Sequence, residues 1–261
     1  MLTRVIAPDV PVTPTVFRGD RFYVRMALAC ASVAVIGFAP TFWVPLSRRA
    51  LDVHPLTHVH ALVFYSWLAL FIRQTSLAAS GRLVRHRELG ILGVALATAM
   101  TFIGVGMAVD SIKRSESAGF GEAGRAFSIV SLSAITLFAV LFALAIRAVR
   151  KPEVHKRLML VATVSLLQAA VGRWFLLFLA PKLPPGVIAS PPPVVVTVMP
   201  GIVVDLLIVI AMVHDRRTTG KVHSTYWYAG AAVLAVQVLR VPLSTTAAWT
   251  WITGGVLALF P

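Results

Sequence analysis

Three histidines recur at nearly equal spacing, each in a short basic turn ahead of an apolar run. They are His86, His155 and His223, which are 69 and 68 residues apart. Neutral imidazole is the commonest protein ligand for transition metals and a frequent axial ligand of haem iron. If the three turns meet at one end of a helical bundle, they predict a site for haem b or for iron, copper or zinc, with a redox or metal-handling role. The alternative interpretation is that these side chains only bind lipid phosphates and backbone carbonyls at the membrane surface.

A second histidine group, His54, His58 and His60, precedes the apolar run that follows it. On a helix, His54 and His58 are four residues apart and share a face, whereas His60 points nearly the opposite way. The first two histidines therefore offer half of a metal site, and a third ligand has to come from elsewhere in the chain. The candidates for that ligand are Asp52, Asp110 and Met107. The alternative interpretation is that these are ordinary interfacial histidines.

Charged and amide side chains also occur inside the apolar runs. These residues are Arg73, Gln74, Gln168, Arg173, Asp205, Gln237 and Arg240. Charges at membrane depth are costly and usually face the bundle interior or water, although Arg73 has room to extend to the surface. We predict that Asp205 pairs with Arg173 or Arg240, which leaves a net positive interior. Such an interior suits a haem propionate, a quinone oxygen or an anionic substrate.

This polar set supports two further functional hypotheses. The first is a transporter, or a lipid- or quinone-binding membrane protein, that works through the buried arginines and Asp205. The second is a structural or assembly factor that turns over no small molecule, in which the set is an ion pair that fixes helix packing. No nucleotide-binding loop, serine-histidine-aspartate order or HExxH motif is present, so the sequence does not decide whether the protein is an enzyme.

The composition indicates the elements that must position these residues. The chain has 261 residues, of which 58% are hydrophobic and 13% charged, and its mean hydropathy is +0.84. These values are typical of an all-α polytopic membrane protein. After a cytoplasmic tail over 1–21 we predict one transmembrane domain over 22–261. Its seven expected spans lie near 23–45, 55–79, 89–109, 127–149, 157–180, 194–214 and 226–249, with an apolar segment over 252–261 at the outer surface.

The distribution of Lys and Arg predicts the orientation of these spans. Of the 24 basic residues, 15 fall on the side of the N-terminus, six on the other side and three inside the spans. The positive-inside rule then puts the N-terminus in the cytoplasm, with membrane lipids as the expected partners. The net charge of +14 comes from these short loops, so it gives no support to nucleic-acid binding. The sequence leaves the oligomeric state open.

The histidine spacing also predicts an internal repeat. A polar or sulfur-containing side chain follows each of the three basic turns by about 14 residues, namely Met100, Gln168 and Gln237. Arg173 and Arg240 follow the last two of these. The second to seventh spans therefore resemble three copies of one helical hairpin, an arrangement that often frames a central site in membrane proteins.

Two motifs carry a resemblance to a known family. The turn His86-Arg87-x-Leu89-Gly90, and the run from His155 to Leu160 followed by Arg173, resemble uncharacterised bacterial multi-pass membrane proteins with a His-Arg-x-Leu-Gly turn. The resemblance implies a helical bundle in the bacterial cytoplasmic membrane and no established activity; Leu158 stands where that family has Trp. Dihaem b-type cytochromes offer a weaker likeness, since His60 and position 74 have their 14-residue spacing, although position 74 is Gln.

Overall fold

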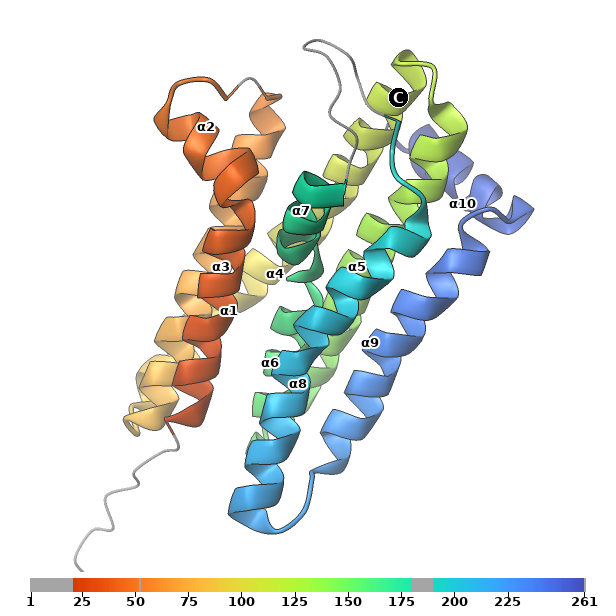
Figure 1. Ribbon diagram of the computed structural model, residues 1–261. Helices are drawn as coiled ribbons and strands as arrows, with labels where there is room; N and C mark the ends of the chain where they lie inside the picture. The colour runs from red at the N-terminus through yellow and green to blue at the C-terminus, as the bar shows by residue number, and fades with distance from the viewer. Residues whose placement is uncertain (1–20, 52, 180–189, 261) are drawn as a thin grey trace, which may run out of the picture.

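The computed structural model describes residues 21–51, 53–179 and 190–260, and these residues form helices and turns with no strand among them (Figure 1). Seven helical segments are long and apolar enough to cross a membrane. The predicted all-α polytopic architecture is therefore confirmed. The continuous spans are α3 (Pro55–Ala79), α4 (Leu83–Ser117), α5 (Gly121–Arg147) and α9 (Ser224–Leu243).

Three spans are built from consecutive shorter helices. The first combines α1 (Phe22–Phe38), the π-helix η1 (Ala39–Trp43) and α2 (Val44–Ser47). The fifth combines α6 (Pro152–Ser165) and α7 (Gln168–Leu179), and the sixth combines the 3-10 helix η2 (Val194–Thr197) and α8 (Val198–Thr219). A further helix, α10 (Ala247–Ala258), replaces the apolar tail expected over 252–261 and begins earlier in the chain.

The helices α4 and α5 extend well beyond the predicted spans. Helix α4 has 35 residues, which makes it about 52 Å long, whereas the hydrocarbon layer is about 30 Å thick. Ion pairs hold the polar extension in helical form. Arg114 lies 3.0 Å from Asp110 one turn earlier, and Arg125 lies 2.7 Å from Glu116 across the α4–α5 turn. A span predicted from hydropathy ends where the apolar residues end, so the prediction did not include this polar extension.

The two ends of the bundle differ in character. The basic end carries the α3–α4, α5–α6 and α8–α9 turns, which hold most of the Lys and Arg residues of the described chain. The far end carries α2, the α4–α5 turn and α10. In Figure 1 the α8–α9 turn lies at the bottom and α10 at the upper right. Both predicted histidine turns with a His-Arg or His-Lys sequence are at the basic end.

The fifth span is broken where it packs most closely on the first. The amides of Leu166 and Leu167 bond to carbonyls three residues back rather than four. Helix α7 packs against both α1 and α8. At Gly37 of α1, an added Cβ would lie only 2.5 Å from the Cβ of Ala170. A glycine is therefore required at this crossing, and the break allows the two backbones to approach.

Two predictions fall on residues outside the described ranges. Most of the cytoplasmic tail over 1–21 and the candidate ligand Asp52 lie there. The described residues 190–193, which include three consecutive prolines, are not helical.

Candidate functional site

Two of the three recurring histidines meet at the basic end. His86 is the fourth residue of α4 and His155 is the fourth residue of α6. Their ring centroids are 6.3 Å apart and their planes are perpendicular, at 89°. Each ring is held by the helix before its own turn. The Nδ1 atom of His86 lies 3.3 Å from the Gln74 carbonyl, and that of His155 lies 2.8 Å from the Ala145 carbonyl.

These contacts determine the tautomer of both rings. A carbonyl oxygen only accepts hydrogen bonds, so Nδ1 of each histidine must carry the proton and donate it. In the neutral imidazole, Nε2 then keeps a free lone pair. An Nδ1–H bonded to a backbone carbonyl is the usual arrangement that orients a histidine for binding a metal through Nε2.

Gln74 fixes the position of His86. Its side-chain Nε2 donates to the backbone carbonyl of His86 at 3.1 Å, while the backbone carbonyl of Gln74 accepts from the His86 ring. The two residues are thus joined twice across the α3–α4 hairpin. Gln74 was predicted as a ligand-binding residue of the membrane interior, and the structure instead places it beside the histidine that it supports.

The third recurring histidine does a different job. His223 is the N-cap of α9, and its Nδ1 accepts from the Thr225 amide at 3.2 Å. Its own amide donates to Asp215 at 3.2 Å. Across the described chain no group of three or more His, Cys, Asp or Glu residues is arranged to hold a metal ion. His223 therefore does not join the other two histidines in a group of three, and only His86 and His155 share the ring contact with a backbone carbonyl.

A buried ion pair beside His223 was missed by the sequence analysis. Arg157 donates two hydrogen bonds to Asp215, from Nε at 2.9 Å and from Nη2 at 2.7 Å. It also donates to the Glu153 side chain at 2.6 Å and lies over the Tyr226 ring. The Tyr226 hydroxyl in turn bonds the Tyr23 hydroxyl at 3.1 Å. A carboxylate within the basic segment His214–Arg217 was the available signal for this network.

The second histidine group, His54, His58 and His60, does not assemble as predicted. His54 precedes α3 and caps it, because its Nδ1 accepts from the Leu56 amide at 3.3 Å. Its spacing to His58 therefore does not define a shared helical face, and both rings are exposed. His60 packs against Phe64 with ring centroids 4.1 Å apart. The expected third ligand Asp110 is bound by Arg114.

Two residues of the intramembrane polar set bond Thr197 of the 3-10 helix η2, and two others bond each other between α8 and α9. We call Gln168, Thr197, Asp205, Gln237 and Arg240 the η2 cluster. Gln168 donates to the Thr197 carbonyl at 2.9 Å, and Arg240 donates to the Thr197 hydroxyl at 2.8 Å. Gln237 donates to Asp205 at 3.3 Å. An added Cβ at Gly201 would lie 2.7 Å from the Gln237 amide carbon, so a larger residue there would displace this side chain.

The predicted ion pair of Asp205 is absent. Within the described chain Asp205 has neither Arg173 nor Arg240 at ion-pair distance, although the charge of Arg240 is close enough to act on it. The remaining two arginines of the set are separate from this cluster. Arg73 is exposed, as expected for a side chain that reaches the surface, and Arg173 lies over the Phe38 ring at 5.1 Å.

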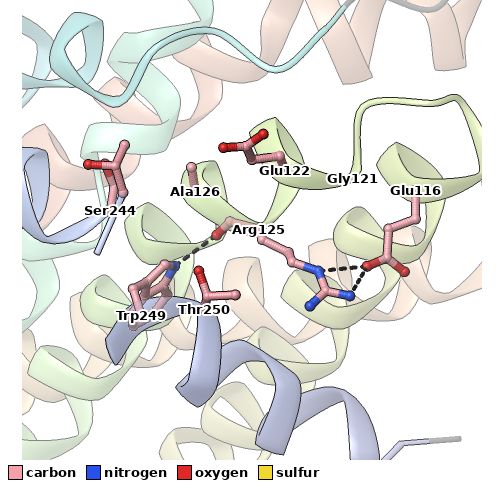
Figure 2. Close-up of a pocket in the computed structure, with 9 residues that line it drawn as sticks. Glu116, Gly121, Glu122, Arg125, Ala126, Ser244, Trp249 and Thr250 are labelled. Carbon is pink, nitrogen blue, oxygen red and sulfur yellow. Dashed lines mark hydrogen bonds and ion pairs between the residues drawn. The ribbon is translucent and has the colours of Figure 1, made fainter. Parts of the chain in front are cut away.

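A cavity of about 360 Å³ opens at the far end, between the α4–α5 turn and α10 (Figure 2). Arg125 and Glu116 form one wall, and the Trp249 indole donates to the Arg125 carbonyl at 2.8 Å. A second cavity, of about 370 Å³, lies at the basic end beside Phe22 and Arg217. Neither cavity is lined by His86, by His155 or by the η2 cluster.

No known family model matches the chain, and neither the curated proteins nor the solved structures include a significant match. The resemblance to bacterial membrane proteins with a His-Arg-x-Leu-Gly turn therefore stays a prediction.

Proposed function

We propose that this integral membrane protein binds a transition-metal ion or haem iron through Nε2 of His86 and His155. The observation that supports the proposal is the matched pair of rings. Both carry the proton on Nδ1, both are anchored to a backbone carbonyl, and their centroids are 6.3 Å apart. A redox or metal-handling role follows from the chemistry of such a centre.

The number of histidines suits some cofactors better than others. Two imidazoles would be enough to hold the iron of a b-type haem. For a single ion they are fewer than the three or four protein ligands usual in zinc sites, so water or a substrate would complete the coordination. An ion held in this way exchanges readily, which fits metal handling better than a permanent structural role.

The test is a visible spectrum, oxidised and reduced, with metal analysis on the same purified sample after expression with haem and metals supplied. We expect a Soret band or a stoichiometric metal, lost in His86→Ala and in His155→Ala. His58→Ala is the matched control, because that ring is exposed and belongs to the other histidine group. A colourless, metal-free protein contradicts the proposal. Full binding of haem or metal by the double variant His86→Ala with His155→Ala also contradicts it.

A second candidate function is ligand binding or transport at the η2 cluster. It is favoured by Arg240, which is buried in α9 with no carboxylate at ion-pair distance among the described residues. Its Nε and the Gln237 Oε1 are buried and have no hydrogen-bond partner there. In proteoliposomes offered labelled carboxylates, Asp205→Asn is expected to abolish uptake while the bundle stays folded. Asp110→Asn is the control, and normal uptake by Asp205→Asn contradicts this function.

A further inference from the structure

We propose that Arg173 and His60 form a separate binding site for the oxyanion head group, phosphate or carboxylate, of a membrane amphiphile. The site lies between α1, α3 and α7, towards the far end of the bundle, and shares no residue with the histidine pair or with the η2 cluster. Helix α1 packs against both α3 and α7, so it joins the two elements that supply the polar groups.

Arg173 is a cation that has no counter-ion among the described residues. In the part of the chain that the structure describes, its guanidinium makes no hydrogen bond and no ion pair, and its Nε is buried. It lies over the face of the Phe38 ring, 5.1 Å from the centroid. A buried charge is costly unless it is paired and hydrogen-bonded. The guanidinium presents five N–H donors in a planar fork that matches a carboxylate or a phosphate.

His60 places a second polar group beside this cation. Its Nδ1 is buried and has no hydrogen-bond partner in the described chain. Its ring packs on Phe64, and it is near enough to Arg173 for the positive charge to act on it. An imidazole N–H can donate to the same oxyanion that the guanidinium binds. Two buried polar atoms without a hydrogen-bond partner among the described residues thus lie on two helices, α3 and α7, that both pack against α1.

The other candidate partners of Arg173 are already engaged. Asp205, which the sequence suggested as its counter-ion, accepts from Gln237 instead. Thr197, the hydrogen-bonding centre of the η2 cluster, is bound by Gln168 and Arg240. Among the described residues, the charge of Arg173 is thus left without a partner.

The position of the site indicates an amphiphile as the source of the anion. His60 is the sixth residue of α3, and Arg173 is followed by six residues of α7. At about 1.5 Å per residue, both lie about 8 Å inside the far ends of their helices. The walls are the aromatic rings of Phe38 and Phe64. One turn beyond Arg173, Leu177 and Phe178 are exposed by 54% and 75% and offer apolar surface for an acyl chain.

The experiment measures lipid retention by the delipidated full-length protein in detergent, using native mass spectrometry. The probes are phosphatidylglycerol, phosphatidylcholine, oleate and inorganic phosphate. We expect one phosphatidylglycerol or oleate per chain and at least about tenfold weaker binding in Arg173→Gln, because charge-assisted hydrogen bonds are lost. Arg73→Gln, which removes another intramembrane but exposed arginine, is expected to bind like the wild type.

The probes distinguish the sources of the oxyanion. Preference for phosphatidylglycerol assigns the head group to a phosphate, and preference for oleate assigns it to a carboxylate. Binding of inorganic phosphate but of no lipid contradicts the proposal that the ligand is an amphiphile. Phosphatidylcholine has no net charge, so binding equal to that of phosphatidylglycerol contradicts the proposal that the site selects an anionic head group. Arg173→Lys keeps the charge but not the fork, and it is expected to bind with intermediate affinity. If Arg173→Gln does not fold, unchanged binding by Arg173→Lys together with His60→Ala overturns the proposal.

Discussion

The pair Arg157–Asp215 is the most deeply buried charge contact among the described residues. Both side chains are only 3% exposed, and the pairing is bidentate. Replacing a buried ion pair by well-packed apolar groups is often neutral, but removing one partner leaves the other charge uncompensated. The contribution of this pair is therefore best measured by breaking one side of it.

We predict that Asp215→Asn lowers the free energy of unfolding by about 3–5 kcal/mol. Denaturant titration in detergent checks this value. Glu116→Gln, which breaks the half-exposed pair with Arg125, is the control, and its expected cost is about 0–1 kcal/mol. The double variant Arg157→Met with Asp215→Leu should recover much of the loss. Equal costs for Asp215→Asn and Glu116→Gln would mean that the buried pair has no special weight.

His223 should make the basic end sensitive to acid. Partial burial, followed by the positive charge of Arg157, lowers the pKa of His223 below its ordinary value. The folded protein therefore prefers the neutral ring, whose Nδ1 caps α9. As the pH falls through about 6.5, the unfolded chain takes up the proton first, so stability decreases.

The measurement compares thermal stability at pH 7.5 and 5.5 in the wild type and in His223→Asn. Asn is a good N-cap that does not titrate, so the variant should lose less stability on acidification than the wild type. The other histidines titrate equally in both proteins and cancel in the difference. Identical pH dependence in the two proteins would show that His223 does not contribute.

At the scale of the helices, the crossing of α1 with α7 depends on one glycine. A Cβ at Gly37 would lie 2.5 Å from the Cβ and 2.6 Å from the carbonyl oxygen of Ala170. Backbone cannot move aside as a flexible side chain can, so we predict that Gly37→Ala destabilises the protein by about 1–3 kcal/mol. Detergent-denaturation curves measure the change.

Gly90→Ala is the matched control for that variant. Gly90 lies inside α4 with no atom in the way of an added Cβ, so the same substitution should stabilise by about 0.5–1 kcal/mol through helix propensity. Similar effects at both positions would rule out the close crossing as the reason for Gly37.

The positions of the seven spans could be predicted because each one contains an apolar run long enough to cross a membrane. All seven spans overlap their expected positions. The π-helix at Ala39–Trp43 and the break before Gln168 could not be predicted. They lie where α1 and α7 approach each other, at Gly37 and Ala170, which are 133 residues apart in the sequence. Local hydropathy contains no information on such a contact.

In the candidate site, too, features that follow from sequence spacing could be predicted, and features that depend on contacts between distant segments could not. The spacing of His86 and His155 predicted two equivalent turns, and the structure brings these rings together. The spacing did not predict that His223 caps a helix, because it does not say where each helix begins. His223 is the N-cap of α9, whereas His86 and His155 are the fourth residues of their helices. Nor does any period relate Arg157 to Asp215, which are 58 residues apart.

For the whole molecule, the distribution of charge predicts one orientation in the membrane. Seven spans put the start of α1 and the start of α10 on opposite sides. The basic end carries the α3–α4, α5–α6 and α8–α9 turns, and a cytoplasmic position for it follows from the positive-inside rule. The proposed metal ligands would then face the cytoplasmic side, and Arg173 with His60 would face the opposite leaflet.

Two serines allow a matched test of this orientation. Ser80 lies at the basic end and Ser117 at the far end, and both are exposed. The natural Cys30 is fully buried, so it should give little background with a membrane-impermeant maleimide. We predict that intact cells label Ser117→Cys, whereas Ser80→Cys is labelled only after lysis. Labelling of Ser80→Cys but not of Ser117→Cys in intact cells would show that the orientation is the opposite one. The histidine pair would then lie outside, where a cytoplasmic supply of metal or haem could not reach it directly.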